Sequence, residues 1–273
     1  MSRPRGRRGS LVIVGTGIEF GAHLTTATRA WIERADKVVF IAADPATAEW
    51  LQALNATAET LRLTDFTPDW HRAPVYRRMG EHIISYVRQG LLVCAVFYGH
   101  PGMLVAPAHE AIRLARAEGY PARLLPAISA QDCLFADLQI DPAQTGWHSF
   151  DATDFLIHRR YADPSSALVL WQIGMVGNPG YRAYDAAGLA VLVEKLAAIY
   201  GSDHEVVVYE AALYAVCDPL IQNVRISNLA TSRITAASLL YVPPKRNAEP
   251  DLAVMMRLAS EFASERGRDS GTS

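Results

Sequence analysis

The sequence predicts an α/β protein with two lobes, a mainly parallel sheet in the first and a smaller mixed sheet in the second. In the first half, short apolar segments of strand length alternate with helical segments, which is typical of a parallel sheet with helices on both faces. After about Asp141 this rhythm changes, and the strand-like segments are separated by longer connections. The chain of 273 residues, half of them hydrophobic, is long enough for two closely packed lobes.

The first lobe is assigned to residues 10–127 and follows a basic tail at residues 1–9, which we expect to be disordered. Its first strand is continuously apolar, as expected of a parallel strand that is buried on both faces. One helix is bounded by Pro74 near its start and Gly90 after its end. The predicted strands are Leu11–Val14, Lys37–Ala42, Leu91–Phe97 and Arg123–Leu125, and the helices end near Ala35, begin at Asp44-Pro45, span Ala73–Gln89 and end near Gly119.

The second lobe is assigned to residues 128–245. It has predicted strands at Ala167–Ile173, Glu205–Tyr209 and Thr235–Val242, and a helix around Gly188–Tyr200. Residues 246–273 then hold one amphipathic helix and a polar end. The helix carries an apolar stripe, formed by Leu252, Met255, Met256, Leu258 and Phe262. We expect this stripe to cover the body of the protein or a partner subunit rather than to bind a cofactor.

Composition and charge exclude several classes of function. A formal net charge of −2 provides no basic excess for binding nucleic acid. The cysteines Cys94, Cys133 and Cys217 are scattered without a CxxC spacing, so neither a disulfide framework nor a metal site is expected. No apolar run reaches the roughly 20 residues of a membrane span, and Leu11–Val14 is too short for a signal peptide. We therefore expect a cytoplasmic protein without nucleic-acid or membrane partners.

Three loops follow the carboxyl ends of predicted strands: Gly15-Thr16-Gly17, Tyr98–Gly102 and Pro126–Ala130. In open α/β sheets, ligands bind at this edge, and glycines let the backbone approach them closely. Each loop alone is more often an ordinary turn, whereas the three together favour a nucleoside pocket. The dinucleotide-binding fingerprint needs a further glycine where Phe20 stands, so binding of a nicotinamide dinucleotide is not supported.

Six longer motifs extend from about Gly9 to Lys245: GSLVIVGTGIEF, FYGHPG, EGYPARLLPAISAQDCLFADLQIDP, LVLWQIG, DHEVVVYEAA and YVPPK. In these motifs the chain resembles the borosin peptide-backbone N-methyltransferases. These enzymes are a branch of the tetrapyrrole methylases, the class III methyltransferases that use S-adenosyl-L-methionine (SAM). The resemblance implies the two-lobed tetrapyrrole-methylase fold, SAM as cofactor in the cleft between the lobes, and a homodimer.

The resemblance also assigns the residues of a cofactor site. The family's cofactor-contact positions fall on Tyr98, His100, Met103, Ser129, Ala130, Gln172, Tyr209, Ala211, Ser238 and Leu239. Simpler roles remain open for two of them. His100 would then satisfy a carbonyl of its own turn, and Gln172 would form hydrogen bonds at a strand end.

The family's catalytic arginine and tyrosine fall on Arg72 and Tyr76, and Tyr98 stands beside the cofactor. Four residues apart at a helix start, Arg72 and Tyr76 share one face. An arginine in a first helical turn opposes the helix dipole, so it does not serve helix stability, but it suits a developing oxyanion. In the alternative reading, Arg72 is solvated and Tyr76 begins the apolar stripe of the helix, with Met79, Ile83 and Val87.

These groups suit the methylation of an amide. The lone pair of an amide nitrogen is delocalised into the carbonyl, so charge must move to the oxygen and the N–H proton must leave. Arg72 stabilises that oxygen, directly or through a tyrosine hydroxyl. Tyr76 or Tyr98 accepts the proton only if a neighbouring cation lowers a pKa that is ordinarily about 10.

The expected function is therefore α-N-methylation of a peptide backbone in the biosynthesis of a ribosomal peptide natural product. About 28 residues follow Lys245 and contain no apolar core peptide, so we expect the substrate to be a separate precursor peptide with a leader segment. Two alternatives remain. One is a class III methylase of a small molecule such as a corrinoid or another tetrapyrrole, and the other is a non-catalytic scaffold that binds nucleoside and peptide.

Overall fold

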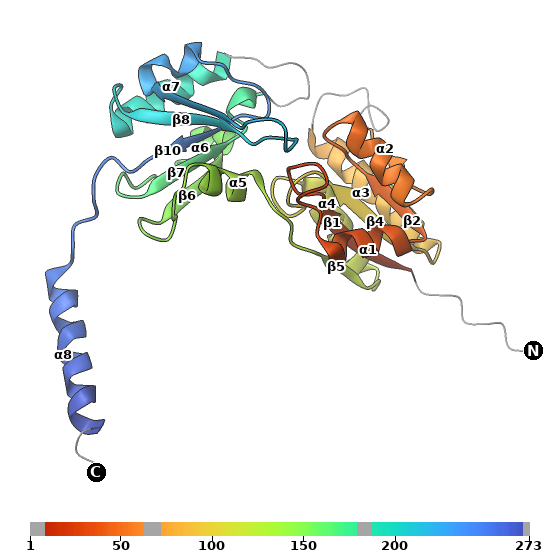
Figure 1. Ribbon diagram of the computed structural model, residues 1–273, viewed down its shortest axis with the longest axis horizontal. Helices are drawn as coiled ribbons and strands as arrows, with labels where there is room; N and C mark the ends of the chain where they lie inside the picture. Colours follow the sequence, from red (N-terminus) through yellow and green to blue (C-terminus); the bar gives the residue numbers. More distant parts are fainter. Residues whose placement is uncertain (1–8, 63–71, 179–186, 270–273) are drawn as a thin grey trace, which may run out of the picture.

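The computed structural model describes residues 9–62, 72–178 and 187–269, and the side chains at 72, 73, 187 and 262–269 lie outside this description. The chain forms two α/β lobes, each built on one five-stranded sheet (Figure 1). The first sheet is parallel and the second is mixed, as predicted. The predicted boundary after residue 127 lies between the last strand of the first sheet and the helix Ala130–Asp137.

The first sheet has the strand order β3-β2-β4-β1-β5, with every described pair parallel. Its strands are β1 Ser10–Gly15, β2 Lys37–Phe40, β3 Glu59–Thr60, β4 Leu92–Phe97 and β5 Ala122–Leu124. The strands β1 and β4 are apolar on both sides because helices cover both faces of the sheet. The helices α3 (Arg72–Arg88) and α4 (Ala106–Ala117) pack on one face, and α1 (Thr26–Arg34) and α2 (Pro45–Leu54) on the other.

The second sheet has the order β6-β7-β10-β8-β9, and only the pair β6 and β7 is parallel among its described strands. Its strands are β6 Trp147–Asp151, β7 Ala167–Trp171, β8 Glu205–Glu210, β9 Leu220–Arg225 and β10 Leu239–Val242. One face packs on α5 (Ala130–Asp137), and the other on α6 (Ala152–Ile157), α7 (Ala187–Tyr200) and the 3-10 segments η2 (Ile173–Met175) and η3 (Ile226–Thr231).

Two strands of the second sheet are shorter than predicted. The strand β10 begins at Leu239 rather than Thr235, because the residues before it form a hydrogen-bonded turn. The strand β7 ends at Trp171 rather than Ile173, because Gln172 adopts a left-handed conformation with φ of 57° and a 3-10 turn follows. Both departures place loop backbone, instead of strand, at the end of the sheet that faces the first lobe.

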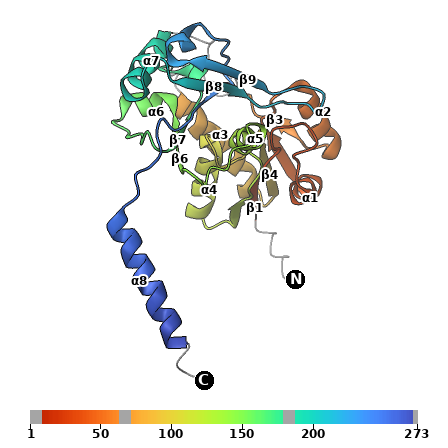
Figure 2. The same cartoon turned by 60° about the vertical axis from the view of Figure 1, so that its left-hand side comes forward.

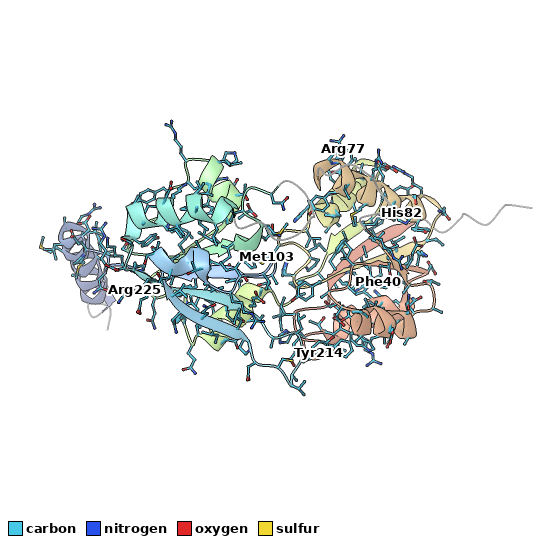
Figure 3. The ribbon with its side chains drawn as sticks, turned by 90° about the horizontal axis from the view of Figure 1, so that it is seen from above. Phe40, Arg77, His82, Met103, Tyr214 and Arg225 are labelled. Atoms are coloured by element: carbon cyan, nitrogen blue, oxygen red, sulfur yellow. The ribbon has the colours of Figure 1, made fainter. Side chains whose placement is uncertain are left out.

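The lobes also contact each other through two loops. The backbone N–H of Phe20 donates to the carbonyl oxygen of Leu213 over 2.8 Å, and the Tyr214 hydroxyl donates to Asp44 Oδ1 over 2.8 Å. The Phe20 ring also packs against Trp50 and Tyr214, with centroid distances of 5.3 and 5.9 Å. We call these five residues the interlobe latch, and Figure 3 shows Tyr214 at the junction of the lobes.

The last helix, α8 (Leu252–Asp269), extends away from both lobes in Figures 1 and 2. The described part of its apolar stripe is exposed to solvent, with Leu252 66% and Met256 69% accessible. The expected packing of the stripe on the body is therefore not observed among the described residues, and packing on a partner subunit stays a prediction. Within the described residues, every helix is too short or too polar to span a membrane.

Candidate functional site

The three loops at the edge of the first sheet lie against one another. A Cβ atom at Gly15 would stand 2.0 Å from the carbonyl oxygen of Gly99 and 2.8 Å from Cβ of Ala127, so the position accepts only glycine. The backbone N–H of Gly99 donates to the carbonyl oxygen of Gly17 over 2.9 Å. This convergence follows from the topology, because the parallel strands β1, β4 and β5 all end at the same edge.

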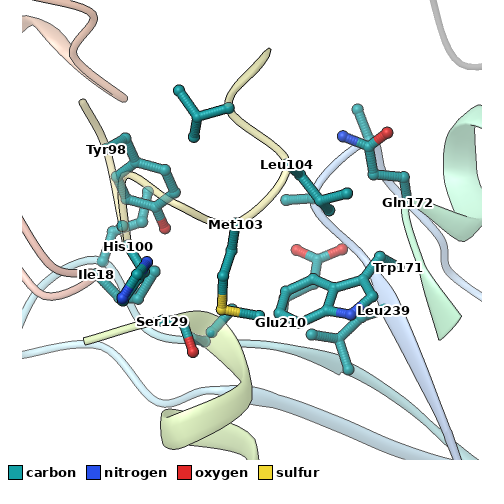
Figure 4. A pocket seen from close by; sticks show the side chains of 17 residues that line it. Ile18, Tyr98, His100, Met103, Leu104, Ser129, Trp171, Gln172, Glu210 and Leu239 are labelled. Atoms are coloured by element: carbon teal, nitrogen blue, oxygen red, sulfur yellow. The ribbon is translucent and has the colours of Figure 1, made fainter. Parts of the chain in front are cut away.

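Residues of the second and third loops, together with Ile18 after the first, form one wall of a cavity of about 350 Å³, and the second lobe forms the other wall (Figure 4). The volume is in the range of about 300–1,000 Å³ that is typical of small-molecule sites. In Figure 4, Tyr98 and His100 lie on one side, Trp171 and Gln172 on the other, and Met103 between them. The cavity therefore requires both lobes.

Eight of the ten predicted cofactor residues line this cavity: Tyr98, His100, Met103, Ser129, Ala130, Gln172, Ala211 and Leu239. The other two, Tyr209 and Ser238, are fully buried beside the lining residues. The Tyr209 hydroxyl donates to Asp137 Oδ2 over 2.5 Å, and the Ser238 hydroxyl donates to the carboxylate of Glu210. Their side chains thus support the wall from behind.

The ring of His100 is fixed by its own turn. Its Nδ1 accepts a hydrogen bond from the backbone N–H of Gly102 over 3.0 Å, which leaves the ring proton on Nε2. A Cβ at Gly102 would come within 3.0 Å of the His100 ring, so the glycine makes room for it. The simpler role considered for His100 was to satisfy a carbonyl of its own turn. In the structure the histidine instead accepts from an N–H of that turn, and it still lines the cavity.

Ser129 is the N-cap of α5 and shares a reciprocal capping box with Asp132. Its hydroxyl and its backbone N–H both donate to Asp132 Oδ2, each over 2.7 Å. Because the hydroxyl is occupied in this way, Ser129 offers the cavity its backbone and Cβ atoms rather than a free donor. The cap also fixes the start of α5 at the cavity wall.

Burial controls the protonation of Tyr98. Loss of hydration, together with the nearby Cys133 thiol and Asp44 carboxylate, raises the pKa of the Tyr98 hydroxyl to about 12. Tyr98 is therefore a hydrogen-bond donor at neutral pH. The phenolate considered from the sequence would require a cation beside it.

Of the remaining catalytic candidates, the structure describes the side chain of Tyr76 alone. Arg72 is the first residue of α3, and its side chain lies outside the described residues. Tyr76 is half-buried and lines a second cavity of about 430 Å³ between α3 and α4, together with Arg77, Ala106, His109, Glu110 and Arg113. The two cavities adjoin along the chain, because Val105 lines the first and Ala106 the second. The described residues thus place Tyr76 in a different cavity from Tyr98.

Sequence reasoning missed several lining residues, chief among them Glu210, Trp171 and Ile18. Glu210 is the last residue of β8 and directly follows a predicted strand, a position that could have identified it. The indole N–H of Trp171 donates to Ser149 Oγ over 2.7 Å, which fixes its ring in the wall. Ile18 directly follows the glycine loop after β1.

The chain is similar to known proteins over both of its lobes. The family model for tetrapyrrole (corrin/porphyrin) methylases matches residues 10–216. Among curated proteins, the chain is 41% identical over 92% of its length to a methyltransferase/gymnopeptides precursor of Gymnopus fusipes. It is 40% identical over 92% of its length to a methyltransferase/omphalotin A precursor of Omphalotus olearius. It spans 61% and 62% of these two relatives, so only part of each is compared.

A further relative, 37% identical over 92% of the chain, is a methyltransferase/type I borosin cyclic peptide precursor of Serendipita vermifera, of which the chain spans 63%. The resemblance to borosin proteins is thereby confirmed. Among solved structures, uroporphyrin-III C-methyltransferase of Thermus thermophilus has a TM-score of 0.63 at 19% identity, covering 87% of this chain and 93% of that one. Cobalt precorrin-4 methyltransferase gives 0.60 at 19% identity, covering 88% and 97%. These two structures support the fold alone.

The family model begins in β1 and ends beyond β8, so it includes residues from both walls of the cavity. The chain therefore belongs to the tetrapyrrole (corrin/porphyrin) methylase family.

Proposed function

We propose that the chain binds SAM in the cavity between the lobes and transfers its methyl group to backbone amide nitrogens of a peptide. The observation that carries the proposal is the gathering of eight predicted cofactor residues in one cavity. The relatives support the choice of substrate, because their names combine a methyltransferase with a ribosomal peptide precursor.

The residues present fit such a cofactor. Glycines at the first wall allow the backbone to approach a nucleoside, and Met103, Ala211 and Leu239 provide apolar surface. SAM, when bound, supplies an electrophilic methyl group. The protein must then orient the amide, exclude water and accommodate the charge that moves to the amide oxygen.

Two residues stabilise that charge in the proposed mechanism, Tyr98 and Arg72. Tyr98 keeps its proton, since burial raises its pKa to about 12, so its hydroxyl donates to the amide oxygen. The guanidinium of Arg72, which is always protonated, stabilises the same oxygen. With Tyr98 in the donor role, Tyr76 or a water molecule remains to accept the amide proton.

We also propose where the peptide lies. The second cavity, lined by Tyr76, His109 and Arg113, is next to the first along the chain, because Val105 lines the first and Ala106 the second. A peptide lying in the second cavity would meet the first cavity at this point, where its amide faces the methyl donor. We also propose that the substrate is a separate precursor peptide with a leader segment. The assay therefore supplies the peptide as a separate molecule.

The test combines purified protein, SAM and such a peptide, followed by mass spectrometry with fragmentation. We expect increments of one methyl mass on backbone nitrogens, and calorimetric binding of SAM without the peptide. Methyl groups only on side chains, or only on a corrinoid offered in competition, would overturn the substrate assignment. Binding of SAM and peptide without any transfer would favour the scaffold.

We further propose that the enzyme acts as a homodimer, as the family resemblance implies. The exposed stripe of α8 supports this proposal, because Leu252 and Met256 offer apolar surface that the body of the chain does not cover. Sedimentation velocity at micromolar concentration should give the mass of two chains, and a single monomer boundary would contradict it.

A further inference from the structure

One charged side chain in the cavity has no part in the proposed reaction. Glu210 ends β8 and lines the second-lobe wall beside Trp171 and Gln172 (Figure 4). Among the described residues that line the cavity it is the one carboxylate, and neither lysine nor arginine accompanies it. The cavity therefore has a negative group without a positive partner from its own described lining.

The carboxylate of Glu210 is held in place by the turn that precedes β10. Its Oε1 accepts hydrogen bonds from the Thr235 hydroxyl, over 2.7 Å, and from the Ser238 hydroxyl. The Ser238 hydroxyl in turn accepts from the backbone N–H of Thr235 over 2.8 Å. Among the described residues, both hydrogen bonds end on Oε1 and none reaches Oε2. Glu210 is thus fixed by one oxygen while the other remains available to a ligand.

A half-buried negative charge is costly when hydrogen bonds satisfy only part of it. A cation in the same cavity offsets that cost, whereas a neutral molecule of the same shape does not. This difference applies directly to a methyl donor. SAM carries a sulfonium cation, and after transfer the sulfur is an uncharged thioether.

We propose that Glu210 makes the cavity prefer cationic SAM to its neutral product, S-adenosylhomocysteine. This inference rests on the proposed function. In the transfer the carbon–sulfur bond breaks and its electron pair stays on sulfur. The amide nitrogen forms the new bond to carbon, and the amide proton leaves to a base. The attraction to Glu210 weakens as the positive charge leaves sulfur, so the product is held less tightly and departs.

Calorimetric titration with three ligands tests the role of Glu210. They are SAM, S-adenosylhomocysteine and an unreactive analogue in which a protonated amine replaces the sulfonium. Glu210→Gln keeps the size of the side chain and an acceptor for Thr235 and Ser238. It should weaken binding of both cations by about tenfold, the order of magnitude of one screened unit-charge attraction, while binding of the neutral product changes less than about twofold.

The matched control is Glu205→Gln, which removes the same charge from the exposed start of the same strand and should leave all three affinities unchanged. A second variant, Glu210→Asp, keeps the charge and should retain the preference for the cations. Loss of the preference for the cations in Glu210→Asp would overturn the proposal. Equal weakening of all three ligands by Glu210→Gln, or no change in any, would also overturn it. Failure of the unaltered protein to bind any of the ligands would instead contradict the proposed function.

Discussion

At the scale of single residues, the raised pKa of the Tyr98 hydroxyl leads to a prediction about how stability depends on pH. A raised pKa in the folded protein contributes stability that is fully present below the unfolded value of about 10 and is lost as pH rises through the folded value. For Tyr98 the folded pKa is about 12. As the pH rises from about 10 to about 12, the free energy of unfolding should fall less in Tyr98→Phe than in the unaltered protein. Denaturant unfolding at each pH measures this difference.

The same variant should transfer methyl groups about 10²–10³ times more slowly, as for loss of one oxyanion donor. The control is Tyr161→Phe, because Tyr161 is 71% exposed and does not line the cavity. A rate for Tyr98→Phe equal to that of the control would show that the Tyr98 hydroxyl does not act on the amide oxygen.

Arg72 and Tyr76 make a second prediction at this scale. Tyr76 does not line the cavity proposed for the cofactor, and Arg72 is assigned to the amide oxygen, so Arg72→Ala and Tyr76→Phe should keep SAM affinity while methyl transfer falls by about 10²–10³. Single-turnover kinetics and calorimetry measure the two effects separately. Arg116→Ala, an exposed arginine on α4, is the control. Near-normal transfer in both variants would contradict the catalytic assignment.

The sequence predicted cavity residues better in the first lobe than in the second. Tyr98, His100 and Ser129 follow strands whose ends are clear from their apolar runs. In the second lobe, Tyr209 was assigned where Glu210 lines the cavity. Successive residues of a strand point to opposite faces, so an error of one position moves a side chain from the cavity to the core.

At the scale of elements, Gly15 ties the three loops to one edge of the sheet. A methyl group there would overlap the Gly99 carbonyl oxygen, which stands 2.0 Å from the added Cβ. Gly15→Ala should therefore abolish SAM binding and lower the free energy of unfolding by about 1–3 kcal/mol, the usual cost of overpacking. Calorimetry and denaturant unfolding measure the two effects.

Gly21→Ala is the control for Gly15→Ala. Gly21 has φ of 72°, but nothing lies within 4 Å of the added Cβ. Gly21→Ala should therefore lower the free energy of unfolding only by the cost of backbone strain, about 1–2 kcal/mol, and should keep SAM affinity. Retained SAM binding in Gly15→Ala would show that the loops can separate without loss of the site.

Strands buried on both faces were predicted from the sequence, whereas the edge strands of the second sheet were missed. The strands β1 and β4 lie in the centre of the first sheet and are continuously apolar, which makes them easy to identify. The strands β6 and β9 are the edges of the second sheet. In β9, Leu220–Arg225, half-buried and exposed residues alternate, but the sequence itself does not alternate apolar and polar residues, so no period-2 signal marks the strand.

At the scale of the whole molecule, the cavity exists only while the lobes are held together. Sequence patterns did not reveal the latch that joins them, because its contacts join segments far apart in the chain, such as Asp44 and Tyr214, which are 170 positions apart. Phe20 was weighed only as the residue that breaks a glycine motif. In the structure its backbone N–H and its ring both contact the second lobe.

The bond from Tyr214 to Asp44 gives a last prediction. Burial acts to raise the pKa of Asp44, but hydrogen bonds from Thr47 and Tyr214 outweigh it and lower the pKa. The carboxylate therefore stays charged at neutral pH, and its contribution to stability is lost as pH falls below the ordinary carboxyl range. Tyr214→Phe removes the bond across the lobes without altering a residue that lines the main cavity.

In Tyr214→Phe the lobes should separate more often, so SAM and S-adenosylhomocysteine should both bind several-fold more weakly, and by the same factor. That equal loss distinguishes the latch from Glu210, which should affect only the cationic ligand. Calorimetry at neutral pH measures both affinities, with Tyr161→Phe again as the control. Undiminished affinity in Tyr214→Phe would mean that the stretch of chain between the lobes and the remaining latch contacts hold the lobes together without the Tyr214 hydroxyl.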